Sequence, residues 1–131
     1  MTALLLSAAL AGCGGRDIDA KAPPGGARGP ALLNNVSTAA VLDAITMAKL
    51  PAVNARDATE AMCPDAGCIQ AHATDTVSIL KFPSTGRAEL YASSVPAMIQ
   101  VEDIVLVFDK TVNAAQKAAY GQVVKQAVAG P

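Results

Sequence analysis

A glycine- and proline-rich segment near the N-terminus limits how much of this chain can fold. Residues 14–30, GGRDIDAKAPPGGARGP, contain five glycines and three prolines and show no apolar periodicity. This composition predicts a disordered tether, because glycine adds conformational freedom and proline interrupts helices and strands. About 100 of the 131 residues remain for a folded domain, expected over residues 31–131. A domain of that size buries about 60 to 65 per cent of the surface that its unfolded chain exposes.

The residues before this segment are apolar but too few to cross a membrane. Residues 3–11 form a run of about nine largely apolar residues, whereas a membrane-spanning helix needs roughly 20. The run has instead the length of the apolar part of a secretory signal peptide, about 7 to 15 residues. It ends in LAGC, residues 10–13. We therefore expect this stretch to be removed rather than folded.

The motif LAGC resembles the lipobox of bacterial lipoproteins. In that family a peptidase cuts before the cysteine, and the cysteine sulfur carries a diacylglycerol group. The resemblance implies a signal peptide over residues 1–12, a lipid-attachment site at Cys13 and a lipidated tether over residues 13–30. It also implies anchoring by lipid at the extracytoplasmic face of the cell membrane. The many alanines, typical of GC-rich genomes, make the composition similar to that of small lipoproteins of high-GC Gram-positive bacteria.

Charge and aromatic content argue against nucleic-acid binding. The formal net charge is -1, and charged residues make up 16% of the chain. Such a chain has no basic field to attract a phosphate backbone or an anionic lipid surface. Two tyrosines, two phenylalanines and no tryptophan leave little material for stacking against bases or sugars. We therefore expect no nucleic-acid partner.

Once Cys13 is assigned to lipid, Cys63 and Cys68 remain as an even pair in CPDAGC. In an oxidising compartment the simplest prediction is a disulfide, which would stabilise the domain by about 2 kcal/mol. A redox-active dithiol is one alternative, although it normally has two intervening residues rather than four. A metal site is the other, and it would need a further ligand beside the two cysteines and His72. The sequence predicts no cofactor and no metal.

Apolar periodicity and capping residues predict three helices and three strands. The helices are expected where apolar residues recur at helical spacing behind a cap, over residues 37–50, 84–95 and 113–129. The strands are expected over residues 69–74, 76–82 and 101–109. The first two strands are expected to form a hairpin, and the third is expected to be central and covered on both faces. Residues 53–62 are expected to be a loop with a single helical turn.

The last helix has the clearest local pattern. Asn113 and Gln116 predict a capping box at its start. Its expected core-facing residues are Ala115, Ala119, Val123 and Ala127.

The order of these elements predicts a small α+β sandwich. About three strands would carry helices mainly on one face, and the Cys63–Cys68 disulfide would close one end. The segment from Lys81 to Ile104 is long enough for a crossover between parallel strands. We therefore expect the two strands that flank this segment to be parallel neighbours.

The motifs contain no complete catalytic constellation. Glu102 and Asp103 could be taken for an acid–base pair, but adjacent residues of a strand point to opposite faces. His72, Asp65 and Asp75 are the candidates left for acid–base chemistry.

Two classes of function follow from these observations. The favoured one is a membrane-anchored envelope lipoprotein that acts without catalysis, as a binding or accessory module for an envelope protein or a small ligand. The alternative is a small extracytoplasmic enzyme with a site assembled around His72. For the binding module, the contact surface is expected over residues 63–75, because a disulfide-fixed loop loses little entropy on binding.

Overall fold

The computed structural model describes residues 34–130, and the predicted signal peptide, Cys13 and the predicted tether lie outside that range. Within it, five strands form one antiparallel sheet in the order β1-β2-β3-β5-β4. The strands are β1 (Arg56–Asp57), β2 (Gln70–Ala73), β3 (Val77–Lys81), β4 (Met98–Val101) and β5 (Ile104–Phe108). The helices are α2 (Thr38–Met47), α3 (Thr59–Ala66), α4 (Thr85–Ala92) and α5 (Ala114–Ala129).

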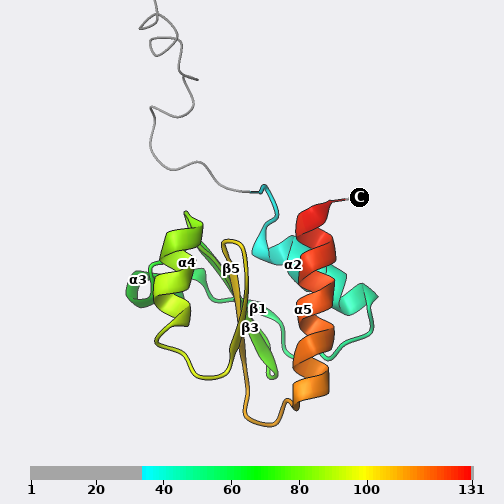
Figure 1. The fold of residues 1–131 in the computed structure, drawn as a ribbon. Helices are drawn as coiled ribbons and strands as arrows, with labels where there is room; N and C mark the ends of the chain where they lie inside the picture. The colour runs from blue at the N-terminus through cyan, green and yellow to red at the C-terminus, as the bar shows by residue number, and fades with distance from the viewer. Residues whose placement is uncertain (1–33, 131) are drawn as a thin grey trace, which may run out of the picture.

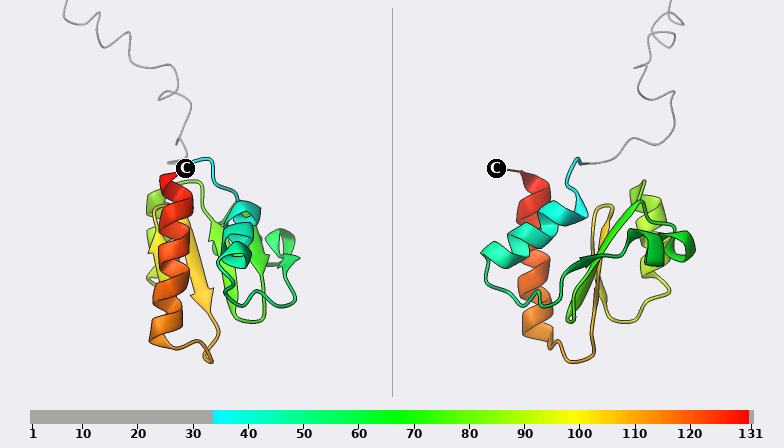
Figure 2. Two further views of the ribbon diagram at one scale, coloured as in Figure 1. Left: turned by 90° about the vertical axis from the view of Figure 1, so that its right-hand side faces the viewer. Right: turned by 180° about the vertical axis from the view of Figure 1, so that it is seen from behind.

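The sheet is the middle one of three layers (Figure 1). Helices α2 and α5 cover one face, and α3 and α4 cover the other, as the side and rear views also show (Figure 2). The apolar cluster under α2 and α5 includes Val41, Ile45, Val77, Ile79, Ile104, Leu106, Phe108, Tyr120 and Val124. The cluster under α3 and α4 includes Cys63, Cys68, Ala71, Ala73, Leu80, Phe82, Ala88, Ala92 and Val105. The α+β class is therefore confirmed, with a core on each face of the sheet.

Several local predictions are confirmed. Strands β2 and β3 form the expected hairpin, with Ala73 paired to Ser78 next to the turn. Strand β5 is buried on both faces over residues 104–106, although β3 rather than β5 is the middle strand. Helices α2 and α4 begin where the sequence predicted helices, and their caps are Ser37 and Ser84, whose hydroxyls accept hydrogen bonds from main-chain N–H groups.

Two expectations about the layers are wrong. The sheet has five strands rather than about three, and helices pack on both of its faces rather than mainly on one. The missed strands have weak signals, because β1 has only 2 residues, both charged and exposed, and β4 has no alternation of polar and apolar residues. Helix α3, expected as a single turn, has 8 residues and ends at Gly67, whose φ is 85°.

The predicted parallel crossover from Lys81 to Ile104 is also wrong. These two residues are paired in an antiparallel ladder between β3 and β5. The chain leaves β3, passes through α4 and returns as the edge strand β4, and a tight turn then places β5 between β4 and β3. The turn consists of Glu102 and Asp103, so these residues do not lie within a strand as expected. Glu102 has a φ of 54°, and no glycine indicates this turn in the sequence.

Helix α5 begins as predicted, and its most buried side lies next to the predicted one. Its capping box is present, with Gln116 N donating to Asn113 Oδ1 at 2.8 Å and Asn113 N donating to Gln116 Oε1 at 3.1 Å. Ala115, expected in the core, is exposed. Ala119, Val123 and Ala127 are half-buried, and Val123 packs against the cluster under α2 and α5. The residues that α5 buries are Tyr120, Gly121 and Val124.

The sheet has two distinct ends. Asn34 lies at the end where β3 stops and β5 begins, next to Lys81 and Asp103. The β2–β3 turn and the last residues of β5 lie at the other end, together with the first turn of α5 (Figure 1). We call these the Asn34 end and the hairpin end.

Candidate functional site

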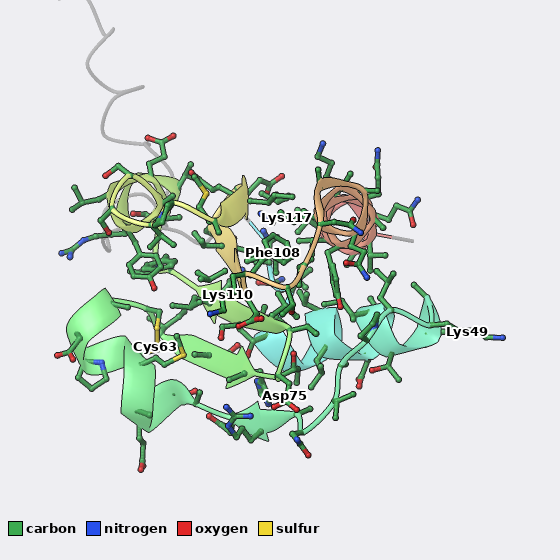
Figure 3. The ribbon with its side chains drawn as sticks, turned by 90° about the horizontal axis from the view of Figure 1, so that it is seen from below. Lys49, Cys63, Asp75, Phe108, Lys110 and Lys117 are labelled. Carbon is green, nitrogen blue, oxygen red and sulfur yellow. A yellow bond between two sulfur atoms is a disulfide. The ribbon has the colours of Figure 1, made fainter. Side chains whose placement is uncertain are left out.

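A cleft of about 220 Å³ opens at the hairpin end of the sheet. Figure 3 views the molecule from this end and labels Asp75 and Phe108, which belong to the cleft. Ser78 of β3 and Val107 of β5 are paired neighbours within it. The lining residues are Thr74, Asp75, Thr76, Val77, Ser78, Val107, Phe108 and Asp109. The cleft is thus built on the β2–β3 turn and on two adjacent strands of the sheet.

A hydrogen-bonded frame positions the cleft. Asp109 N donates to Thr76 O at 2.9 Å, which joins the end of β5 to the β2–β3 turn. Tyr120, a buried residue of α5, donates its phenolic hydrogen to Pro51 O and lies 3.3 Å from Thr76 Oγ1. Thr76 Oγ1 also donates to Pro51 O at 3.1 Å. The turn, the end of β5, the α2–β1 loop and α5 therefore hold one another at this end.

Two carboxylates give the cleft negative charge. Asp75 Oδ2 accepts a hydrogen bond from Asn54 Nδ2 at 2.7 Å. Asp109 Oδ2 accepts two from Thr111, from Oγ1 at 2.7 Å and from the main-chain N at 3.0 Å. The two bonds from Thr111 favour the ionised form of Asp109 and lower its pKa below the usual value of an aspartate. Asp109 is therefore ionised at neutral pH.

The chemistry of the cleft suits recognition. The hydroxyl of Thr74 donates to Val77 O at 2.9 Å, and that of Thr76 is held by Pro51 O, so both serve the main chain. Among the residues that line the cleft, none is a histidine, cysteine or lysine. Its polar groups are carboxylates, hydroxyls and main-chain amides, which bind donors and cations by hydrogen bonds and charge.

His72 lies away from the cleft, on β2 and facing α2. Its Nδ1 is 2.8 Å from Thr38 Oγ1. Thr38 is only 1% exposed, so a substrate cannot reach this hydroxyl. Asp57 of β1 is paired with His72 across the sheet. The pKa of Asp57 is lowered mainly by hydrogen bonds from Thr59 and least by the charge of His72. The Thr38 hydroxyl and the His72 imidazole thus connect α2 to β2, and neither residue belongs to the lining of the cleft.

The structure does not bring the three predicted acid–base residues together. Asp65 is exposed in the last turn of α3, on the other side of the sheet from α2. Asp75 lies in the β2–β3 turn, at the hairpin end. His72 contacts α2. A site assembled around His72 would therefore lack the two carboxylates that the sequence offered for it.

The predicted disulfide is confirmed. Cys63, in the last turn of α3, is bonded to Cys68, two residues before β2. Both residues pack into the cluster under α3 and α4. The alternative of a metal site with His72 does not fit, because His72 faces α2 on the opposite side of the sheet. Within residues 34–130 there is also no group of three or more histidine, cysteine, aspartate or glutamate residues that could hold a metal ion.

A buried ion pair that was not predicted from the sequence lies at the Asn34 end. Lys81 Nζ lies 3.1 Å from Asp103 Oδ2, and the two side chains are 3% and 0% exposed. Nζ also donates to Asp103 Oδ1 at 3.2 Å, whereas Oδ2 has no hydrogen bond of good geometry and is held by charge alone. The sequence did indicate that Lys81 is buried, because it follows the apolar residues Val77 and Ile79 at a spacing of two and so lies on the same face of the strand.

Asn34 completes this arrangement. Its main-chain O and its Oδ1 accept hydrogen bonds from Lys81 Nζ at 3.0 and 2.6 Å. Its Nδ2 donates to Asp103 Oδ1 and to Glu102 Oε1, each at 3.0 Å. We call these four residues, Asn34, Lys81, Glu102 and Asp103, the ion-pair cluster. A second cavity, of about 130 Å³, adjoins it and is lined by Asn35, Val36, Ser37, Ile69, Gln70 and Lys81.

Comparison of the chain with protein-family models, with curated proteins and with solved structures found no match. None of the helices between residues 34 and 130 combines the length and the apolar character that crossing a membrane requires.

Proposed function

We propose that the chain is a membrane-anchored lipoprotein of the bacterial envelope that acts as a non-catalytic binding or accessory module. The feature that carries the proposal is LAGC, residues 10–13, at the end of the apolar N-terminal run. Cys13 would carry the lipid at the extracytoplasmic face of the cell membrane, and residues 13–30 would form the tether. The partner would be an envelope protein or a small ligand.

The arrangement of the described residues supports contact at the hairpin end. Asn34, the first residue that the structure describes after the predicted tether, lies at one end of the sheet, and the cleft lies at the other. A flexible tether of about 18 residues spans roughly 25 Å. The cleft can therefore meet a neighbour anchored in the same membrane, where shared anchoring raises the effective concentration of both.

This proposal narrows the contact surface that the sequence suggested over residues 63–75. Thr74 and Asp75 from that range line the cleft. The disulfide lies at the start of β2, whereas the cleft lies beyond its end. We therefore place the contact surface at the turn and the β5 end rather than at the disulfide.

The surroundings of His72 favour contact over catalysis. Activation of a hydroxyl by histidine requires a substrate to reach that hydroxyl. The hydroxyl that His72 contacts belongs to Thr38, which is buried against β2. His72→Ala should accordingly reduce stability and leave binding at the cleft unchanged. An enzyme reading would be favoured if His72→Ala abolished function while stability and binding were retained.

The anchoring is tested by the mass and the location of the protein in cells. Two acyl chains, each contributing about 0.8 kcal/mol per buried methylene, hold a protein stably on a membrane. The wild-type protein should fractionate with membranes and carry a lipid mass on Cys13. Cys13→Ser should release the protein or leave the uncleaved precursor. A wild-type protein without lipid on Cys13 would contradict the proposal.

The contact surface is tested by photo-crosslinking in intact cells. A photoreactive residue in place of Ser78 lies in the cleft, and one in place of Glu60 lies on the exposed side of α3 as the matched control. We expect an adduct of defined mass from position 78 only, and we expect Asp109→Arg to abolish it by reversing the charge. Equal adducts from both positions, or an adduct insensitive to Asp109→Arg, would contradict the proposed surface.

A further inference from the structure

The ion-pair cluster lies where the described part of the chain begins. Asn34 is held there by Lys81, the last residue of β3, and by Asp103, which directly precedes β5. We infer that the cluster is a mechanical clamp, which passes a pull on the N-terminal segment to the two strands that carry the cleft. The biological use of the clamp rests on the proposed anchoring at Cys13, whereas its construction rests on the contacts described above.

Strands β3 and β5 connect the clamp to the cleft. They are antiparallel neighbours, paired from Lys81 and Ile104 at the Asn34 end to Val77 and Phe108 at the hairpin end. Val77 and Phe108 line the cleft. A pull between Asn34 and a molecule bound in the cleft would therefore act along these two strands, which are buried in the middle of the fold.

Without the clamp, the same pull would act first on α2. Ser37, the cap of α2, follows Asn34 by only three residues, and its hydroxyl accepts a hydrogen bond from Ala40 N at 3.0 Å. Helix α2 contributes Val41 and Ile45 to the apolar cluster, so unwinding this helix would open the core. The clamp takes up the pull before it reaches the helix.

The charges of Lys81 and Asp103 are better suited to resisting a pull on Asn34 than to raising the stability of the fold. A buried ion pair can often be replaced by apolar residues of similar volume without loss of stability, because removing charges from water is costly. Charge-assisted hydrogen bonds, in contrast, are short and directional. Lys81 Nζ makes two such bonds to Asn34, at 3.0 and 2.6 Å, and Asp103 fixes the position of the ammonium group. Asn34 is therefore held in one place along the direction of the pull.

The test applies a constant force to the full chain without lipid. One handle is attached to the Cys13 thiol and the other to a cysteine introduced by Lys110→Cys, an exposed position just beyond the cleft, with the disulfide kept intact. Three changes are compared in this background. Asn34→Ala removes the bridging side chain, and Lys81→Met with Asp103→Leu replaces the charges by apolar groups. Asn35→Ala, at the exposed neighbouring position, is the matched control.

We expect Asn34→Ala and the Lys81→Met/Asp103→Leu variant to unfold roughly tenfold faster or more at the same force, because hydrogen bonds to charged groups are lost. Asn35→Ala should unfold at the background rate. The double variant should keep the unfolding free energy of the background protein in urea, since its apolar replacements fill the same space. Loss of mechanical resistance without loss of equilibrium stability is a result that a merely structural role would not produce.

Equal unfolding rates under force for Asn34→Ala and Asn35→Ala would overturn the clamp. A faster rate of the double variant that is fully matched by a lower unfolding free energy would overturn it as well. If the double variant does not fold, the comparison of Asn34→Ala with Asn35→Ala still decides. Because no lipid and no ligand take part, failure here leaves the proposed lipoprotein function standing, and absence of lipid on Cys13 in cells leaves the clamp standing.

Discussion

Two aspartates flank β5 and show how differently the two ends of the sheet use the same side chain. Asp103, before the strand, is fully buried and paired with Lys81. Asp109, after the strand, is exposed and accepts hydrogen bonds from Thr111. A buried carboxylate needs its partner, because an uncompensated charge inside a protein is costly, whereas an exposed one keeps its hydration and is free to meet a ligand. Burial rather than residue type thus separates a structural end from a candidate binding end.

The sharpest test of this contrast removes one aspartate at a time. Asp103→Ala leaves Lys81 buried without its counter-ion and should lower the free energy of unfolding by about 3 to 5 kcal/mol. Asp109→Ala should change it little, as for other exposed positions. Urea denaturation measures both. Equal losses at the two positions would show that the ends do not differ in this way.

Removal of the disulfide, which lies near the Asn34 end, should lower the stability of the fold by an intermediate amount. Cys68 is next to Ile69, whose main-chain N donates to Lys81 O at 2.7 Å. The short closed loop contributes about 2 kcal/mol, so reduction should lower the melting temperature by several degrees. Alkylation of the oxidised protein, which has no free thiol at these positions, is the control. Complete thiol labelling of Cys63 and Cys68 without prior reduction would contradict the prediction.

A smaller loss is expected when the frame of the hairpin end is weakened. Tyr120→Phe removes the phenolic hydroxyl that donates to Pro51 O but keeps the ring in the core. The loss should be about 1 kcal/mol, since Thr76 Oγ1 still donates to the same oxygen. Thermal unfolding measures the loss of stability in Tyr120→Phe, and Asp103→Ala is measured beside it for comparison. A loss as large as that of Asp103→Ala would mean that the hairpin end is as sensitive to a lost polar contact as the Asn34 end.

The smallest effect concerns the ionisation of Asp109. Thr111→Ala removes the side-chain hydrogen bond that is the largest cause of the lowered pKa, so the pKa of Asp109 should rise toward its usual value. A lowered pKa in the folded state adds stability that is present above the unfolded value, about 3.9, and is lost as the pH falls through the folded value. Thr111→Ala should reduce this loss in acid. Titration by NMR checks it, with Thr111→Ser as the control that keeps the hydroxyl, and an unchanged pKa in Thr111→Ala would refute it.

Local patterns in the sequence predicted those parts of the fold that depend on neighbours along the chain. The caps at Ser84 and Asn113, and a cap at either Ser37 or Thr38, were predicted because a capping side chain bonds main-chain groups within one turn of its own helix. The β2–β3 hairpin was predicted because its strands are joined by a short turn. The disulfide was predicted because the proposed lipid attachment at Cys13 would leave Cys63 and Cys68 as an even pair.

Other parts of the fold depend on contacts between distant residues. Strand β4 and the reversal of β5 required a turn at Glu102, which has a positive φ without being glycine. The candidate site could be predicted only in part for the same reason. Thr74 and Asp75 belong to the contact surface expected from the sequence, whereas Val107 and Asp109 do not. The latter two reach the cleft only because β5 pairs antiparallel with β3.

The sequence by itself determined the helix caps, the disulfide and the α+β class, because these follow from residue type and from spacing over a few positions. The tertiary structure alone decided that helices cover both faces, that β3 and β5 run antiparallel, and that His72 contacts α2. It also decided that Lys81 meets Asn34 and Asp103, 47 and 22 residues away along the chain. Such pairings are selected by the burial of apolar surface in the whole domain and by the need to give every buried charge a partner, and neither condition is visible in a short stretch of sequence.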